Sequence, residues 1–316
     1  MENKITNRIV ITGGSGFIGT SLLIKFKQNN FNDILVIDKH KPQLEWGQYI
    51  IGNFEKRELL ENAIQKNDIV IHLACSTVPS TSELDKARDI NENILSSLML
   101  FDICAKKKIN KIIFLSSGGT VYGDHGKKIL KETDLTNPIN SHGIMKLAIE
   151  QYINLFNRLY GLNYIILRAA NPYGWPFLLP AQTDANKLFH REKNQGVIDI
   201  FLRKAINNET LEIWGDGKIV RDYIHIDDLT NFIITLIKNP IQNKLFNAGA
   251  GIGTEINEIV KIIKKITEKK LSVSYLPKRN FDVPHNILDI KKARKLIDWE
   301  PRIGIEEGIK MVYKNI

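Results

Sequence analysis

Residues 8–28 read RIVITGGSGFIGTSLLIKFKQ, and this stretch decides how the N-terminal half of the chain folds. A short β-branched run from Arg8 to Thr12 breaks into a glycine-rich turn, and helical periodicity follows from Thr20 to Gln28. The turn has the spacing GxxGxxG. Strand, glycine turn and helix in this order are the context that a dinucleotide-binding fingerprint requires.

The three spaced glycines have different physical tasks. Gly13 permits a tight turn, Gly16 lets the backbone approach a pyrophosphate, and Gly19 lets helix and strand pack closely. The N-terminus of the following helix then faces the anion, which brings Phe17 and Ile18 into the predicted cofactor site.

A second predicted strand, DILVIDK, ends in Asp38, 19 residues after Gly19. A carboxylate at this point accepts hydrogen bonds from the adenosine ribose hydroxyls and repels a 2′-phosphate. The pattern therefore favours NAD over NADP, although the neighbouring Lys39 leaves NADP open. The alternative is that Asp38 is an ordinary turn residue at a strand end.

Further strands alternate with helices along the chain. Residues 68–75, DIVIHLAC, are almost wholly apolar, as expected inside a parallel sheet, and residues 111–117 and 164–171 read as further strands. This spacing predicts an α/β fold: a Rossmann-type doubly wound parallel sheet with right-handed crossovers, followed by a smaller C-terminal α/β region. Residues 175–196 are long for a connection, and we expect them to pass over the active site and influence substrate preference.

Composition sets outer bounds on function. The 316 residues are 43% hydrophobic and 25% charged, which is typical of a globular protein. No run approaches the roughly 18 apolar residues of a membrane span, and the N-terminus enters a strand directly, so we expect a cytoplasmic protein without a membrane partner. Cys75 and Cys104 are too few for a disulfide framework and are predicted to be reduced.

The net charge of +9 raises the question of nucleic acid binding. The lysines occur in short runs, 106–108, 264–270 and 291–295, on predicted helix faces. A solvated surface explains them better than a nucleic-acid interface, and part of the surplus suits a pyrophosphate-bearing ligand. We predict no nucleic-acid partner and no metal site.

Three further segments carry a family resemblance. They are the strand end and helix start between Ser116 and Lys146, IWGDGKIVRDYIHIDD at 213–228, and LPKRNFDVPHNILDIKKARKLIDWEP at 276–301. Together with the glycine turn they resemble the extended short-chain dehydrogenase/reductase superfamily, and within it the NAD-dependent nucleotide-sugar epimerases and dehydratases such as UDP-glucose 4-epimerase. The resemblance runs from Arg8 to Pro301, nearly the whole chain.

The resemblance implies an NAD-binding domain at 1–174, with contributions from about 220–250, and a nucleotide-sugar-binding region at 175–316. Asn53 stands where the family usually has an acidic residue, and its amide oxygen can still accept a bond from the adenine amino group. Asn93 would hold the segment beside the nicotinamide, or is a local helical hydrogen bonder. The implied NAD-binding residues are Gly13, Gly16, Phe17, Ile18, Gly19, Asp38, Lys39, Asn53, Phe54, Leu73, Ala74, Asn93 and Lys146.

The family places a tyrosine four residues before its catalytic lysine, and here that position is His142, before Lys146. Nearby positive charges help a phenol, of pKa about 10, to ionise. The same charges disfavour protonation of an imidazole, of pKa about 6.5, and leave a neutral ring that can accept a proton. Its reach is shorter, so a bridging water can be required.

Three interpretations of His142 remain open from the sequence: a general base, a bystander while water or another group takes the proton, and an impaired or substituted site. Gly118 is a second departure, since the family usually has Ser or Thr there. Thr120, or after it Ser117, is the expected replacement, because Thr120 shares a strand face with position 118 if the extended geometry persists.

The resemblance also implies the substrate contacts. Arg221 and Arg279 would hold a diphosphate, for which a guanidinium offers paired hydrogen bonds. Asp282 would bind the nucleotide ribose, and Asn171 and Thr120 would contact the sugar nucleotide.

The implied activity is that of a nucleoside-diphosphate-sugar 4-epimerase in the synthesis of surface polysaccharide precursors. A dehydrogenase or ketoreductase that performs one redox half is the first alternative, because loss of the tyrosine affects an epimerase twice per turnover. A non-catalytic NAD- or sugar-nucleotide-binding regulator is the second. Dehydratase chemistry ranks lower because Gly118 and Gly119 supply no acidic pair.

We expect a homodimer or higher oligomer paired through the helix that carries Lys146. The apolar positions on this helix can serve either that interface or the core, and they are Ile144, Leu147, Ala148 and Tyr152.

Overall fold

The computed structural model describes residues 7–41, 44, 46–53, 56–126, 128–174 and 196–314. The prediction for residues 175–195 and the assignment of Phe54 to the cofactor site lie outside the described residues. The chain forms two compact units that interleave in sequence. Unit 1 contains residues 1–117, 140–168 and 230–246, and unit 2 contains residues 118–139, 169–229 and 247–316.

The centre of unit 1 is a sheet to which seven strands of the described chain contribute, in the order β11-β7-β5-β4-β1-β2-β3. The central strand β1 lies parallel to both neighbours, and its Ile9 pairs with Ile34 of β2 and Ile69 of β4. Every residue of β1 and β4 is buried, as their apolar runs predict. The strands are β1 (Ile9–Thr12), β2 (Ile34–Asp38), β3 (Gln48–Ile51), β4 (Ile69–His72), β5 (Lys111–Ser117), β7 (Tyr164–Ala169) and β11 (Lys244–Ala248).

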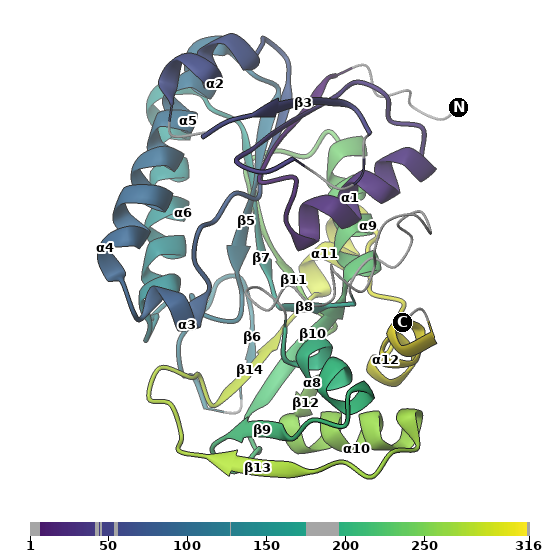
Figure 1. Ribbon diagram of the computed structural model, residues 1–316. Helices are drawn as coiled ribbons and strands as arrows, with labels where there is room; N and C mark the ends of the chain where they lie inside the picture. Colours follow the sequence, from purple (N-terminus) through teal and green to yellow (C-terminus); the bar gives the residue numbers. More distant parts are fainter. Residues whose placement is uncertain are drawn as a thin grey trace. The chain divides into compact units, whose positions relative to one another are not determined.

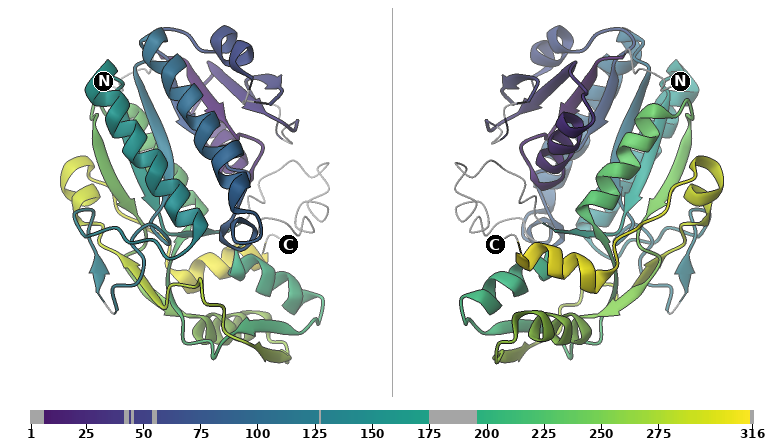
Figure 2. Two further views of the ribbon diagram at one scale, coloured as in Figure 1. Left: turned by 90° about the vertical axis from the view of Figure 1, so that its left-hand side faces the viewer. Right: turned by 90° about the vertical axis from the view of Figure 1, so that its right-hand side faces the viewer.

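Helices cover both faces of this sheet. Figures 1 and 2 place α2, α5 and α6 on one face, and α1 and α9 on the other. The strand order, with β1 between β2 and β4, and the helices on both faces confirm the predicted doubly wound Rossmann-type fold. The helices are α1 (Phe17–Gln28), α2 (Arg57–Ala63), α3 (Pro79–Ser82), α4 (Lys86–Arg88), the π-helix η1 (Asp89–Ile94), α5 (Leu95–Lys107), α6 (Ser141–Tyr160) and α9 (Ile226–Lys238).

Unit 2 is built around β10, which lies parallel to β8 and β14 and antiparallel to β12. The strand before β10, β9, pairs instead with β13, and the two are parallel. The strands are β6 (Ile129–Leu130), β8 (Asn171–Tyr173), β9 (Leu211–Trp214), β10 (Val220–His225), β12 (Gly253–Glu255), β13 (Val273–Leu276) and β14 (His285–Leu288). The helices are α8 (Val197–Ile206), α10 (Ile256–Thr267), α11 (Lys291–Ile297) and α12 (Ile305–Lys314).

A buried ion pair fixes α6 against the sheet of unit 1. Arg168 of β7 donates from Nη2 to Oε2 of Glu150 over 2.7 Å, and Ser116 of β5 donates from Oγ to Oε1 of the same carboxylate over 2.5 Å. All three side chains are buried. Since one unpaired member would leave a buried charge, the trio strongly specifies how α6 lies on β5 and β7.

Among the described residues, no helix is both long and apolar enough to cross a membrane.

Candidate cofactor and active site

The glycine turn between β1 and α1 has the shape that its sequence predicts. Gly13 has φ +80°, and a Cβ there would lie 2.5 Å from the backbone nitrogen of Ala74. A Cβ on Gly19 would lie 2.5 Å from Cα of Gly14, whereas one on Gly16 would come no closer than 3.6 Å to the oxygen of Gly13. The turn is therefore closed at Gly13 and Gly19 and open at Gly16. Phe17 and Ile18 begin α1, whose first turn has no acidic residue, so the helix N-terminus suits an anion.

Asp38 ends β2 and ties it to the glycine turn. Its Oδ2 accepts a hydrogen bond from the backbone N–H of Ser15 over 2.9 Å, and its Oδ1 accepts one from that of His40 over 3.0 Å. Each carboxylate oxygen has a second lone pair with which it can accept a ribose hydroxyl. Asp38 is thus a turn-organising residue, and its remaining lone pairs leave the predicted ribose contact compatible with that role.

The other predicted cofactor residues lie in the loops after the strands of unit 1. Leu73 and Ala74 follow β4 and are half-buried, and the N–H of Leu73 donates to the carbonyl of Thr12 over 3.0 Å. Asn53 follows β3 and is half-buried, and Lys39 follows β2 and is exposed. These loops occur at the carboxyl ends of parallel strands, where doubly wound sheets bind their ligands.

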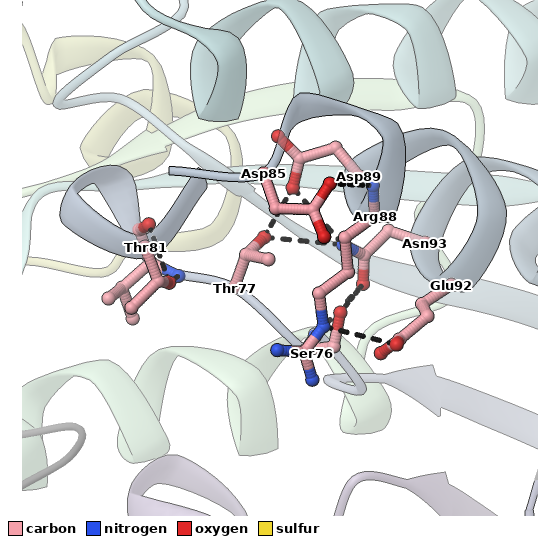
Figure 3. A network of polar contacts seen from close by, with 9 residues as sticks. Ser76, Thr77, Thr81, Asp85, Arg88, Asp89, Glu92 and Asn93 are labelled. Atoms are coloured by element: carbon pink, nitrogen blue, oxygen red, sulfur yellow. Dashed lines mark hydrogen bonds and ion pairs between the residues drawn. The ribbon is translucent and has the colours of Figure 1, made fainter. Parts of the chain in front are cut away.

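Asn93 holds the loop after β4 from the π-helix η1. Its Oδ1 accepts a hydrogen bond from the N–H of Ser76 over 2.9 Å, and its Nδ2 donates to Oγ1 of Thr77 over 3.2 Å (Figure 3). Asn93 is buried, whereas Asn91 of the same short helix is exposed. The observed contacts are those of a residue that shapes the segment after Ala74, and a π-helix at this point is typical of functional sites.

His142 and Lys146 lie in the first turns of α6, and both are buried, with 8% and 6% of their surfaces exposed. The ammonium of Lys146 donates to the carbonyl of Leu115 in β5 over 2.9 Å and lies 5.0 Å from the ring centroid of Phe114. Among the described residues, no hydrogen-bond partner reaches Nδ1 of His142. A buried imidazole nitrogen of this kind is an available acceptor or donor for a ligand.

The environment of His142 keeps its ring neutral. Burial and, after it, the charge of Lys146 lower the pKa of His142 to about 3, although the charge of Asp89 partly opposes both. A neutral ring can accept a proton from a hydroxyl, as the sequence reasoning expects. The same burial makes the protonated form costly, so His142 is a weak base in this protein.

The two expected hydroxyl groups fall in different units. Ser117 is half-buried at the end of β5 in unit 1, while Thr120 belongs to unit 2. The predicted strand over residues 111–117 is β5, which ends at Ser117, and residues 118–120 form a turn. The extended geometry that would place Thr120 on the strand face of position 118 therefore does not persist, because Gly118 and Gly119 weaken a strand. Oγ1 of Thr120 is buried and has no hydrogen-bond partner in the part of the chain that the structure describes.

In unit 2 the predicted phosphate-binding residues form one cluster. Arg279 donates from Nε to Oδ2 of Asp282 over 2.9 Å and from Nη2 to Oδ1 over 3.2 Å. Arg221 is half-buried and donates to the carbonyls of Val220 and Val283. Burial lowers the pKa of Arg221, Asp282 raises it, and Arg279 lowers it, so the three charged groups act on one another. Two guanidinium groups and one carboxylate leave a net positive charge, which suits a diphosphate.

Asn171 begins β8, and its Nδ2 donates to the carbonyl of Asp222 over 2.9 Å. This bond connects β8 to β10, and it leaves the amide oxygen of Asn171 as a possible acceptor for a ligand.

Sequence reasoning missed two groups of residues near these sites. The carboxylates of Asp89 and Glu83 hold the start of α6. The rings of Trp214 and Phe281 flank the guanidinium of Arg279, each with its centroid 5.2 Å away. Trp214 and Phe281 lie in the segments 213–228 and 276–301 that carry the resemblance, so aromatic residues there were an available signal. The sequence carries no such signal for Asp89 and Glu83.

Comparison with known proteins supports one family. Residues 9–249 match the NAD dependent epimerase/dehydratase family. A protein of Methanocaldococcus jannaschii provisionally named UDP-glucose 4-epimerase is 33% identical over 96% of both chains. The dTDP-4-dehydro-6-deoxyglucose reductase of Escherichia coli is 29% identical over 98% of both chains.

Among solved structures, the UDP-glucose 4-epimerase of Thermotoga maritima with UDP-glucose is 34% identical. It superimposes with a TM-score of 0.87 over 98% of both chains.

Proposed function

The chain belongs to the NAD dependent epimerase/dehydratase family, and from this premise we propose that it is a nucleotide-sugar 4-epimerase. The observation that carries the proposal is the start of α6, where a buried His142, whose Nδ1 has no hydrogen-bond partner among the described residues, lies four residues before an anchored Lys146. NAD, bound along the glycine turn, would supply the reversible oxidation at C4 of the sugar. The turn, open at Gly16 and bordered by Asp38, fits this cofactor.

In this proposal the residues of unit 1 handle the proton. His142 accepts the proton of the sugar 4-hydroxyl and returns it after the keto-sugar has rotated. Lys146, fixed by the Leu115 carbonyl, keeps a positive charge beside the ring and disfavours lasting protonation of the imidazole. Thr120 of unit 2, with Ser117 as the second candidate, is proposed to orient the reacting oxygen. Its buried hydroxyl, which has no hydrogen-bond partner in the described part of the chain, supports that role.

The residues of unit 2 bind the diphosphate end of the substrate. Arg221 and Arg279 offer hydrogen-bond donors to phosphate oxygens, and Asp282 keeps the Arg279 guanidinium oriented by two bonds. Asp282 and Asn171 remain the proposed contacts to the ribose and the sugar nucleotide. The net positive charge of the cluster favours a dianionic ligand.

A one-way reductase or dehydrogenase is the second candidate, and two observations favour it. The Escherichia coli relative is named a reductase, at 29% identity. His142 is also a weak base whose burial opposes protonation, which penalises an epimerase in both halves of its cycle.

The experiment begins with the purified protein. Denaturation releases any bound nicotinamide for identification, and the native protein is incubated with UDP-glucose, UDP-N-acetylglucosamine, dTDP-glucose and the corresponding 4-epimers. Products are identified by NMR while absorbance reports reduced cofactor. Interconversion of 4-epimers without accumulated NADH supports the epimerase, whereas lasting NADH supports the dehydrogenase. If the protein holds nicotinamide but neither interconverts epimers nor accumulates NADH with any sugar, both enzyme functions are contradicted. The non-catalytic regulator would then be the remaining candidate.

We also propose that α5 and α6 form a homodimer interface. Ile144 and Tyr152 of α6 are 57% and 39% exposed, so they do not belong to the core of the protomer. Leu95 of α5 and Leu159 at the end of α6 are exposed as well. An exposed apolar surface on adjacent helices is the feature that an interface between copies would bury.

Light scattering after size exclusion tests the dimer. Ile144→Glu should reduce the mass from dimer to monomer, and Leu135→Glu, at an exposed leucine of unit 2, is the control. An unchanged dimer in Ile144→Glu would contradict this interface. The cytoplasmic location and the absence of a nucleic-acid partner remain predictions.

A further inference from the structure

The carboxylate of Asp89 connects three segments of unit 1. Thr77, in the loop after β4, donates from Oγ1 to its Oδ1 over 2.5 Å (Figure 3). Ser82 at the end of α3 and Ser141 at the start of α6 donate their hydroxyls to its Oδ2, the latter over 2.6 Å. Asp89 itself is 2% exposed, at the first position of η1. A buried carboxylate that accepts several hydrogen bonds holds those donors in one geometry.

The first residue of α6 is held twice. The hydroxyl of Ser141 is bound by Asp89, and its backbone N–H donates to Oε1 of Glu83 over 2.7 Å. Asn140 caps the same helix by accepting a hydrogen bond from the N–H of Gly143 over 2.8 Å. Because His142 follows Ser141 directly, these contacts determine where the imidazole ring is presented.

Asp89 also determines the charge around the ring. Within the described part of unit 1, the charges that act on His142 are Lys146 from its own helix and Asp89 from η1, with opposite signs. Burial favours the uncharged form of Asp89, yet the hydrogen bonds from Ser141, Ser82 and Thr77 lower its pKa below the ordinary value. Asp89 is therefore an anion at neutral pH and favours the imidazolium, against Lys146.

We propose that Asp89 is a positioning residue that orients His142 through Ser141 and stabilises the imidazolium formed when His142 accepts a proton. The proposal rests on the proposed function, because it assigns the counter-charge for that proton transfer. It also fits an imidazole better than a phenol at this position: a phenolate gains nothing from a neighbouring carboxylate, whereas an imidazolium does.

The sign of the charge effect supplies a test that needs no turnover. In the His142→Tyr variant the group at this position ionises to an anion, so the carboxylate of Asp89 raises the pKa of that phenol. Asp89→Asn in the same background should lower that pKa by about one pH unit. Ultraviolet absorbance of the phenolate gives the pKa, after subtraction of the matching protein that retains His142.

Three further variants separate charge from shape. Asp89→Glu in the His142→Tyr background keeps the negative charge, so the pKa of the phenol should stay near its value in His142→Tyr alone. Asp89→Ser is a second neutral variant, and Asp102→Asn removes a half-buried carboxylate of α5, paired with Lys106, as the control. With His142 present, Asp89→Asn should lower kcat about tenfold or more with KM for the nucleotide sugar unchanged.

An unchanged or raised phenol pKa in Asp89→Asn would overturn the proposal, whether or not the enzyme turns over. The proposal would also be overturned if Asp89→Asn and Asp89→Ser both failed to fold while Asp89→Glu folded. The carboxylate would then be required for folding alone. A lowered phenol pKa with no epimerase or dehydrogenase activity in the wild type would support the electrostatic role and remove the proposed function instead.

Discussion

The glycine turn after β1 and the first turn of α6 contribute to the same candidate site in opposite ways. The turn follows the family pattern, and its shape comes from contacts between backbone atoms, as at Gly13 against Ala74. The start of α6 carries His142 where the sequence resemblance implies tyrosine, and the pKa of His142 is set by burial and by the charges of Lys146 and Asp89. In the proposed function, cofactor binding therefore depends on steric fit, whereas proton transfer depends on an electrostatic balance that one substitution can shift.

The largest expected effect is the loss of NAD affinity when the glycine turn is changed. Gly13→Ala places a Cβ 2.5 Å from the backbone of Ala74 at a φ of +80°, so the turn must move. We expect NAD affinity to fall at least about a hundredfold, as measured by calorimetry. Gly161→Ala is the matched control, because Gly161 has φ +70° and a Cβ added there would meet nothing within 4 Å, so it imposes backbone strain without overlap. Equal NAD affinity in wild type and Gly13→Ala would contradict the steric account.

The diphosphate cluster of unit 2 gives the next effect. Arg279→Ala removes a guanidinium that Asp282, Trp214 and Phe281 orient. Charge-assisted hydrogen bonds contribute about 1.5–3 kcal/mol, so the affinity for UDP should fall about tenfold to a hundredfold with NAD affinity unchanged. Arg294→Ala, at an exposed arginine paired with Glu300, is the control. If UDP binds Arg279→Ala as tightly as wild type, this cluster is not the diphosphate site.

The electrostatic half predicts a smaller effect on stability. His142 has a folded-state pKa of about 3, below the unfolded value of about 6.5, so the unfolded state takes up the proton first as the pH falls. The stabilisation is complete above pH 6.5 and is lost toward pH 3, by about 1.4 kcal/mol per pH unit. His72, whose pKa burial also lowers to about 3, makes stability depend on pH in the same way. Asp222, whose pKa burial raises to about 6, makes stability increase as the pH falls.

Because several groups contribute, the part due to His142 is measured as the difference in pH-dependent unfolding free energy between wild type and His142→Gln. Urea denaturation of wild type and His142→Gln at pH 7 and pH 5 should show a smaller pH dependence in the variant, by about 2 kcal/mol. His125→Gln, at a histidine that is not buried, should keep the wild-type dependence. An equal pH dependence in wild type and His142→Gln would mean that the ring is not held neutral by burial.

The sequence was sufficient for features that depend on local pattern. The run from Arg8 to Gln28 predicted β1, the turn and α1, and the helix start before Lys146 predicted α6. Features that depend on contacts across the chain were beyond it. The bond from Ser141 to Asp89 joins residues 52 positions apart, and no local pattern indicates it. The end of β5 at Ser117 was predicted, whereas the turn at residues 118–120, which takes Thr120 off the strand face, was left open by the sequence.

The pairing of Arg279 with Asp282 illustrates an intermediate case. The spacing of three residues allowed a contact, but the sequence assigned the two residues to different parts of the substrate. The structure has them bound to each other, so any ribose contact of Asp282 must share the carboxylate with a guanidinium.

Turnover of His142→Ala tests the central claim most directly. With the sugar nucleotide that the wild type converts, and with bound nicotinamide verified in both proteins, kcat should fall about 10²–10⁴-fold while KM changes little. A kcat equal to that of the wild type would contradict the account, because the proton of the sugar hydroxyl would then pass through a group other than His142.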